Sequence, residues 1–395
     1  MKDENDRLIE GTLPLDPEAD AVPFIPKSAR DAAAALERWS VRAAGDRLLA
    51  LSEKRPPVFM WPGGHSGADV ETGSTIPGDV LEAMESKRMP GWASLARTGG
   101  PLTADRVVVM VGHTNRGKSA WAVQLAEQAA RDGAPVLYMS CEMGTGELAA
   151  RLVALRAKGD SGAFRNGVPH RGIKNGRADP DGLRLALDGL VADCPALYLW
   201  APARNERTAG NLQQIAANIS SAHDNRPPLI IVDYLQRLAD GPDRRQAVLD
   251  MSGVLRDIAR DDGCGIMAKE WPGACVVVLS TVARNKYELV ASTENLEKAS
   301  KGIAPGKNSS VEPSLEGVGK ESGEIESDAD LLIVLTSDKG ETAEPREGLA
   351  AIAKNRGGGN SGTVSMEFLP ACGRWRENIQ GDAGKAARNA KRART

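Results

Sequence analysis

An eight-residue run that begins at Gly112 contains the residue types that bind phosphate groups. Gly112 and Gly117 permit a backbone that turns successive N–H groups toward an anion. Lys118 supplies a cation for the terminal phosphate oxygens, and the Ser119 hydroxyl can bind Mg²⁺. The run predicts a P-loop for a nucleoside triphosphate, in which His113 offers its backbone and its ring has no assigned chemistry. The residues expected to bind the nucleotide are Gly112, His113, Thr114, Asn115, Arg116, Gly117, Lys118, Ser119 and Ala120.

Two carboxylates that follow apolar segments complete the chemistry of such a site. Asp233 follows the apolar residues 229–232, and its expected role beside a P-loop is to hold Mg²⁺ through water. Glu142 follows residues 136–140. Since ligand groups gather at the carboxyl ends of parallel strands, Glu142 is expected to face the γ-phosphate as the base that activates water. Without the P-loop, Asp233 would be interpreted as an ordinary strand-end carboxylate. Position alone would leave Glu142 as a solvent-exposed turn carboxylate, and its role depends on the further blocks described below.

The elements that must position these residues alternate between strand and helix. Short apolar runs predict buried strands, longer runs with helical spacing predict helices, and the segment from residue 349 to residue 368 predicts a β-hairpin around residues 355–362. The fold class is therefore α/β, with a mostly parallel sheet covered on both faces. The predicted strands are 106–111, 136–140, 196–200, 229–232, 275–279 and 331–335, and the predicted helices are 118–131, 147–157, 183–192, 209–222 and 247–260.

Composition excludes several classes of protein. The 395 residues are 41% hydrophobic and 26% charged, with a net charge of −3, so the chain as a whole is not a strongly basic nucleic-acid binder. Five widely spaced cysteines suggest neither a zinc site nor a disulfide framework. The sequence contains no 18-residue apolar run and starts with an acidic segment. We therefore expect a cytoplasmic protein without a membrane span.

Changes in composition along the chain predict four regions. Residues 1–27 are acidic and interrupted by prolines, which predicts disorder. Residues 28–90 are expected to form a helix over 28–53 and then a linker rich in Gly and Pro. The α/β pattern occupies residues 91–378, within which residues 285–327 are expected to form a long polar loop. Residues 379–395 form a basic tail that could contact DNA or simply keep the chain soluble.

Several blocks in the α/β region resemble a known family in the same order. The chain resembles the ATPase domain of the DnaB-type replicative helicases, which has the RecA-like fold. The resemblance covers about residues 90–378, and Asp233-Tyr234-Leu235-Gln236 is its most specific part. Its blocks are the P-loop, residues 136–143 with 147–152, residues 230–236, residues 321–330, and residues 353–364.

The resemblance implies roles for residues at matching positions. In the family, the glutamate at the position of Glu142 is the catalytic base. The hairpin lysine and arginine, here Lys354 and Arg356, reach into the ATP site of the neighbouring subunit. A ring or filament of identical subunits, with a hexamer as the family's form, is therefore implied. The catalytic residues expected on these grounds are Glu142, Lys118, Arg356 and Lys354, the metal-binding residues are Ser119 and Asp233, and the cofactors are ATP and Mg²⁺.

The chain departs from the family pattern at Thr281 and in residues 1–90, among other places. The family has Ser-Gln at the end of its fourth strand, where the glutamine senses the γ-phosphate, whereas this chain has Ser280-Thr281. We expect Thr281 and Gln236 to share the sensing role. Residues 1–90 are too short, and wrongly composed, for the family's helical N-terminal domain. This feature resembles the reduced helicases of phages, plasmids and other mobile elements.

A helicase must hold single-stranded DNA, which proteins bind through backbone charge on loops and through stacking. The residues expected to contact it are Arg244, Arg245, Arg284 and Lys286, with a loader or primase as a further partner. Two other functions fit the same sequence: a RecA-like ATPase that assembles on DNA without unwinding it, and a scaffold that binds nucleotide only to oligomerise. Strand separation on a forked duplex distinguishes the first function from both alternatives.

Overall fold

The structure is a computed structural model that describes residues 58–59, 92–156, 180–238, 244–260, 272–305, 311–319, 323–340, 345–357 and 362–378. All of these belong to the compact unit from Pro57 to Thr395. The predictions for residues 1–27, for the helix at 28–53 and for the tail at 379–395 lie outside the described residues. In the part of the chain that is described, no helix combines the length and apolar character needed to cross a bilayer.

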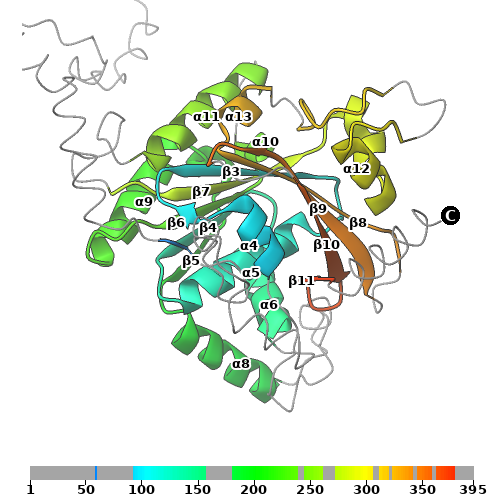
Figure 1. Ribbon diagram of the computed structural model, residues 1–395. Helices are drawn as coiled ribbons and strands as arrows, with labels where there is room; N and C mark the ends of the chain where they lie inside the picture. Colours follow the sequence, from blue (N-terminus) through cyan, green and yellow to red (C-terminus); the bar gives the residue numbers. More distant parts are fainter. Residues whose placement is uncertain are drawn as a thin grey trace, which may run out of the picture. The chain divides into compact units, whose positions relative to one another are not determined.

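A nine-stranded sheet forms the centre of the described fold, with the strand order β11-β10-β9-β8-β3-β7-β6-β4-β5 (Figure 1). The six strands from β8 to β5 in this order are parallel, and β9, β10 and β11 are antiparallel to their neighbours. The strands of this sheet are β3 (Arg106–Gly112), β4 (Val136–Ser140), β5 (Leu197–Trp200), β6 (Leu229–Asp233), β7 (Cys275–Thr281), β8 (Leu331–Ser337), β9 (Arg346–Asn355), β10 (Gly362–Leu369) and β11 (Arg374–Glu377).

The register of the parallel strands brings their carboxyl ends to one edge of the sheet. Gly112 pairs with Thr281 on one side and with Leu335 on the other. On the next strands along, Ser140 pairs with Asp233. The residues that end these strands are therefore neighbours in space although they are far apart in sequence. In such sheets, ligands bind at this edge.

Helices cover both faces of the sheet because successive strand residues point to opposite sides. Val108 and Met110 pack with Trp121 and Leu125 in one core, whereas the alternate strand residues pack in a second core against α9 and α11. Figure 1 shows α5 and α6 on one side of the sheet and α9 and α11 on the other. The main helices are α4 (Ala93–Gly99), α5 (Lys118–Arg131), α6 (Thr145–Arg156), α8 (Pro180–Asp193), α9 (Ala209–Ala222), α10 (Leu235–Leu238) and α11 (Arg244–Ala259).

The predicted α/β fold with a C-terminal hairpin is confirmed, and the structure adds elements around it. β1 (Val58–Phe59), which lies within the predicted linker, pairs with β2 (Leu102–Thr103), and Phe59 is buried in the core. After the hairpin of β9 and β10, the chain continues into β11. Trp375 of β11 stacks on Phe368 at 4.7 Å between ring centroids. The sequence does not predict β11, because its four residues, Arg-Trp-Arg-Glu, include only one apolar side chain.

The prediction of one long polar loop over residues 285–327 is wrong for much of that segment. It contains a 3₁₀ helix, η4 (Arg284–Val290), and the helices α12 (Thr293–Ser300) and α13 (Gly323–Asp328). The Ser292 side chain caps α12 by accepting a hydrogen bond from the Asn295 N–H at 3.2 Å. Leu289, Val290 and Leu296 are fully buried. A few well-placed apolar residues anchor the segment, although its composition is polar.

Candidate active site

The P-loop connects the end of β3 to the start of α5, as the sequence predicts. Gly117 has a φ of 88°, a left-handed conformation that favours glycine. A Cβ at Gly117 would also come within 2.7 Å of the Trp375 ring, whose Nε1 donates a hydrogen bond to the Gly117 carbonyl at 3.0 Å. Gly112 has the same restriction, because a Cβ there would lie 2.6 Å from the Leu335 carbonyl oxygen. Packing against β8 and β11 therefore requires both glycines of the motif.

Lys118 is held at the mouth of the loop by the loop's own carbonyl groups. Its ammonium donates hydrogen bonds to the carbonyls of Gly112 at 2.7 Å and His113 at 3.2 Å. Burial lowers the pKa of Lys118 to about 8, although the nearby carboxylates of Asp233 and Glu142 oppose this shift. A phosphate group would restore the electrostatic stabilisation that the cation loses on burial.

The Asp233 carboxylate lies at the end of β6 beside the first turn of α5. It is 1% exposed and accepts hydrogen bonds from the Tyr138 hydroxyl, at 2.9 Å, and from the Ser119 hydroxyl. Burial raises the pKa of Asp233, and these two hydrogen bonds and the charge of Lys118 oppose the shift. A hydroxyl and a carboxylate in contact are hard oxygen ligands, which Mg²⁺ prefers. The donor set therefore fits the predicted magnesium role for Ser119 and Asp233.

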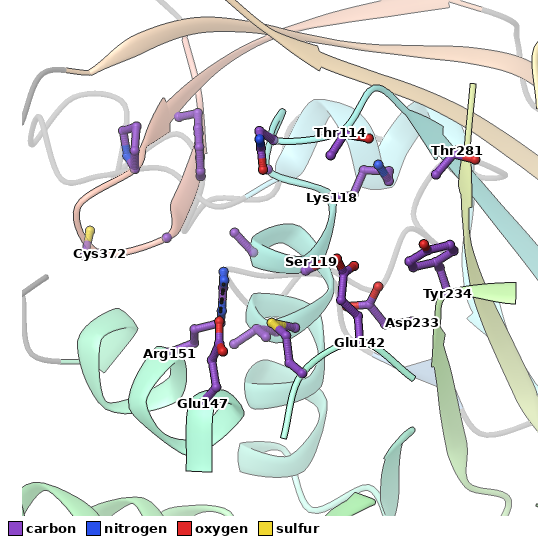
Figure 2. Close-up of a pocket in the computed structure, with 18 of the residues that line it drawn as sticks. Thr114, Lys118, Ser119, Glu142, Glu147, Arg151, Asp233, Tyr234, Thr281 and Cys372 are labelled. Atoms are coloured by element: carbon purple, nitrogen blue, oxygen red, sulfur yellow. Dashed lines mark hydrogen bonds and ion pairs between the residues drawn. The ribbon is translucent and has the colours of Figure 1, made fainter. Parts of the chain in front are cut away.

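Glu142 lies two residues beyond the end of β4, and its side chain is exposed to the cavity. The turn that carries it is fixed by two hydrogen bonds: the Cys141 N–H donates to the Asp233 carbonyl at 2.7 Å, and the Met143 N–H donates to Ser140 Oγ at 2.8 Å. Figure 2 shows Glu142, Asp233 and Ser119 close together beside Lys118. This places a carboxylate where a water molecule could attack a phosphate held by the P-loop.

These residues line one cavity of about 580 Å³. Its wall includes most of the predicted nucleotide-binding residues together with Glu142, Asp233 and Thr281. The cavity extends past the phosphate-binding residues toward α6 and the turn between β10 and β11. Ten further residues line it that are not among the predicted site residues. These are Val123, Met143, Glu147, Arg151, Tyr234, Arg346, Phe368, Pro370, Cys372 and Gly373.

Comparison with known proteins agrees with this geometry. Residues 90–270 match the DnaB-like helicase C terminal domain. The chain is 25% identical, over 357 residues, to the replicative DNA helicase DnaB of Leifsonia xyli subsp. xyli, an alignment that covers 86% of this chain and 68% of the relative. It is also 23% identical, over 282 residues, to a probable replicative DNA helicase of Trieres chinensis, covering 66% of this chain and 51% of the relative. Over residues 90–270 this chain is therefore similar to the DnaB-like helicase family, as the sequence predicts.

Solved structures show the same fold. One of them, an ATPase domain solved on its own, has a TM-score of 0.53 and 21% identity, covering 79% of this chain and 99% of that one. A DnaB-like replicative helicase, described with its interactions with primase, has a TM-score of 0.52 and 20% identity, covering 75% of this chain and 64% of that one. These structures confirm the predicted RecA-like fold. The family match and the helicase relatives confirm the predicted resemblance and the enzyme class of an ATP-hydrolysing helicase.

Two P-loop side chains of this DnaB-like chain point away from the phosphate site. The Arg116 guanidinium is buried and donates hydrogen bonds to the carbonyls of Ser337 and Ala291, the latter at 2.8 Å. The His113 ring packs edge-on against Tyr287, with 4.8 Å between ring centroids. Arg116 and His113 can therefore serve the nucleotide only through their backbones.

The two predicted sensor residues differ in their position relative to the cavity. Thr281 lines the cavity, whereas Gln236 is 2% exposed, does not line it, and donates a hydrogen bond from its Nε2 to Ser280 Oγ at 2.7 Å. Gln236 thus fixes the residue next to Thr281. In this structure its position fits support of the sensor strand better than contact with a phosphate.

Lys354 and Arg356 lie at the opposite edge of the sheet from the P-loop of their own subunit. The Arg356 N–H donates to the Asp330 carbonyl, and Gly112 pairs with Leu335, five residues farther along the chain. At about 3.3 Å per residue, the two levels are roughly 16 Å apart along the strands. Both side chains donate instead to the Ser327 carbonyl at the end of α13, Lys354 at 2.8 Å. They do not line the cavity of their own chain.

The predicted DNA-binding residues separate into three groups. Arg284 is exposed on η4, and its contact with DNA stays a prediction. For Lys286 the structure contradicts the prediction, because this residue is only 8% exposed. Its ammonium donates hydrogen bonds to the carbonyls of Glu312 and Ser314 at 3.3 and 3.0 Å. Lys286 therefore stabilises the following loop and is not presented to DNA. Arg244 and Arg245 begin α11, but their side chains lie outside the described residues.

Changing Glu142 to glutamine should leave ATP affinity intact and lower turnover. The amide keeps the size of the side chain but cannot accept a proton from water, so we expect a loss of roughly 10²–10⁴-fold in kcat. Steady-state hydrolysis and binding of a fluorescent ATP analogue measure the two effects separately. Glu294→Gln, on the exposed Glu294–Lys298 pair, is the matched control. Normal hydrolysis by Glu142→Gln would remove this residue from catalysis.

Nucleotide affinity should fall as the pH rises through about 8, the pKa of Lys118. Below that pH the side chain is an ammonium that attracts phosphate, and above it the neutral amine does not. A bound triphosphate favours the charged form, so binding at about pH 9 should take up a proton. Calorimetry with a non-hydrolysable ATP analogue, in buffers of different ionisation enthalpy, measures that uptake. An affinity that does not change between about pH 7 and about pH 9 would contradict the assignment.

Proposed function

We propose that this chain hydrolyses ATP with Mg²⁺ and uses the reaction to move on single-stranded DNA as a ring of identical subunits, with a hexamer as the form that the family resemblance implies. One observation carries the proposal: a single cavity brings together Lys118, Ser119, Glu142 and Asp233, while Lys354 and Arg356 lie at the far edge of the same sheet. The site is therefore divided between two subunits.

Hydrolysis follows from the positions of the side chains. The triphosphate lies along the N–H groups of the P-loop and the N-terminus of α5, where the backbone dipoles favour an anion. The Lys118 ammonium binds the terminal phosphate oxygens, and Ser119 and Asp233 would hold Mg²⁺, which neutralises phosphate charge when bound. Glu142 orients a water molecule in line with the γ-phosphate and accepts its proton.

The neighbouring subunit completes this site. Its Arg356 and Lys354 would stabilise the charge that builds up on the transferring phosphoryl group. A surface that reaches from one edge of a subunit into the opposite edge of the next is a heterologous interface, which closes into a ring or continues as a filament. Images of single particles with ATP and single-stranded DNA distinguish these two assemblies from a monomer.

A forked DNA duplex tests the motor function directly. The unaltered protein should separate its strands with ATP and Mg²⁺ and should not do so with a non-hydrolysable analogue. ATP-dependent binding to single-stranded DNA without strand separation would replace the motor by the second candidate, a RecA-like ATPase that assembles on DNA. The specific observation that favours this second candidate is Thr281, whose short side chain replaces the glutamine of the helicase family.

The wider biological setting is part of the same proposal. We infer a phage, plasmid or other mobile element as the source, from the composition of residues 1–90, and a loader or primase as a partner. A cytoplasmic location follows from a role in copying DNA. Co-purification with a tagged primase or loader from the same element tests the partner. We also propose residues 91–378 as the ATPase domain. A disordered acidic segment at 1–27 and a helix with a linker rich in Gly and Pro at 28–90 precede it, and a basic tail at 379–395 follows it.

A further inference from the structure

The P-loop holds the segment after β7 through two side chains that the phosphate site does not use. The Arg116 guanidinium donates to the Ala291 carbonyl, directly after η4. The His113 ring meets the Tyr287 ring in the middle of η4, with an interplanar angle of 61°. The Thr336 hydroxyl fixes the same segment from β8 by donating to the Val290 carbonyl at 2.8 Å. A change in the P-loop therefore acts directly on η4.

η4 has one buried side and one exposed side. Leu289 and Val290 are fully buried, whereas Arg284 and Asn285 are exposed and Tyr287 is 39% exposed. An exposed cation beside an exposed aromatic ring is the combination that binds the backbone and bases of single-stranded nucleic acid. Tyr287 is thus the residue of this surface that also contacts the P-loop.

Binding of a phosphate group can shift His113, one of the two residues in the contact between the His113 and Tyr287 rings. The Lys118 ammonium donates to the His113 carbonyl as well as to that of Gly112. It has three donor hydrogens, and a bound phosphate competes for them. Loss or weakening of the bond to His113 changes the orientation of that peptide and of the ring it carries. Thr281, the cavity residue that leads into η4, has a shorter side chain than glutamine and so a smaller reach toward the phosphate.

We propose that the contact between the His113 and Tyr287 rings couples occupancy of the phosphate site to the affinity of η4 for single-stranded DNA. In this role Tyr287 is a positioning residue: it acts on Arg284 and the rest of η4 and takes no part in the chemistry of hydrolysis. The inference rests on the proposed function, and it extends that function by naming the side chains through which nucleotide and DNA influence each other.

The test compares Tyr287→Leu with Tyr287→Phe. The quantity measured is the ratio of affinities for a fluorescent oligo-dT with a non-hydrolysable ATP analogue and with ADP. Couplings between sites are typically about 5–150-fold, and in Tyr287→Leu we expect this ratio to fall to about one. Tyr287→Phe keeps the ring and should keep the ratio. Because coupling is reciprocal, DNA should also lose its effect on nucleotide affinity in Tyr287→Leu, while hydrolysis without DNA stays unchanged.

Two further variants separate coupling from direct contact and from general damage. Arg284→Ala should weaken DNA binding with both nucleotides and leave their ratio intact. His223→Leu removes a similar edge-on ring pair, in which His223 lies 5.8 Å from Tyr198 of the far strand β5 between ring centroids. This variant should change neither the affinity for DNA nor the ratio of affinities. Thermal unfolding verifies that each variant is folded.

The outcomes distinguish failure of the coupling from failure of the proposed function. An unchanged ratio of DNA affinities in Tyr287→Leu overturns the coupling alone. The coupling alone is also overturned if the unaltered protein binds DNA with a ratio of about one. Equal loss of affinity with both nucleotides in Tyr287→Leu, with the ratio intact, also overturns the coupling and leaves Tyr287 with a direct DNA contact only. Absence of DNA binding by the unaltered protein overturns both the coupling and the motor.

Discussion

Replacing Lys118 by alanine is expected to weaken ATP binding by roughly 10²–10³-fold, equivalent to about 3–4 kcal/mol, and to remove hydrolysis. The ammonium is the one side-chain cation among the P-loop residues whose charge faces the cavity, since the Arg116 guanidinium binds carbonyls of Ser337 and Ala291. No other charge on the loop can replace it. Binding of a fluorescent ATP analogue, followed by anisotropy, measures the loss.

The matched control is Lys339→Ala, which removes an exposed lysine that follows β8. It should bind ATP as the unaltered protein does. Thermal unfolding of Lys118→Ala shows whether the loop carbonyls of Gly112 and His113 keep the fold without their donor. Retained ATP affinity in a folded Lys118→Ala variant would contradict the phosphate site itself.

The local sequence predicts those site residues that lie at the ends of their own strands. Gly112, Asp233 and Thr281 follow short apolar runs that predict buried strands, and parallel strands align their carboxyl ends. Their proximity needs only the order of the strands. The position of Glu142 follows from the run at residues 136–140 in the same way, whereas its catalytic role is predicted from the family resemblance.

Contacts made by segments remote in sequence could not be predicted in this way. Trp375 lies 258 residues from Gly117, yet its ring is the reason that no larger residue fits there. The sequence around β11 contains no pattern that reveals this partner. Arg346 lines the cavity for the same kind of reason, through the register of β9 against β8 and β10.

Charged residues were the least predictable, because a charge pattern does not reveal whether a side chain turns outward. Arg284 and Lys286 lie two positions apart on η4, but one is exposed and the other donates to carbonyls of the following loop. A lysine can bury its stem and satisfy its ammonium with backbone groups, and only the fold decides whether it does. The contact of the His113 ring could not be predicted either. The ring packs against Tyr287, and the position of His113 within the P-loop motif does not suggest this partner.

The position of Lys354 and Arg356 strengthens the inference of a shared site. Their strand runs antiparallel to β8, so its end reaches the edge at which β3 and β8 begin. Contacts with α13 hold both side chains there. A cation fixed on this edge cannot turn to the phosphate site of its own chain without breaking the end of β9, whereas it can meet a second copy that stacks edge to edge.

Replacing Arg356 by alanine is accordingly expected to lower ATP turnover by roughly 10³–10⁵-fold, the effect of an arginine supplied from a neighbouring subunit. ATP binding and folding should change little. The ion pair between Arg356 and Asp330 is 3.7 Å long, and the arginine side chain is 48% exposed, so its loss should cost less than about 1 kcal/mol of stability. Arg376→Ala, which breaks an ion pair with Glu367 on the adjacent hairpin, is the control.

Mixing the two inactive variants tests whether the arginine acts between subunits. A subunit with Arg356→Ala keeps an intact phosphate site, and one with Lys118→Ala keeps an intact Arg356. When the two mix equally, about a quarter of the heterologous interfaces join both intact halves, so turnover should rise well above that of either variant alone. If Arg356 instead served its own chain, neither kind of subunit would contain a complete site, and no mixture would recover activity. Recovery therefore requires both a shared site and an assembly, the arrangement that we infer from the positions of Lys118 and Arg356 on opposite edges of one sheet.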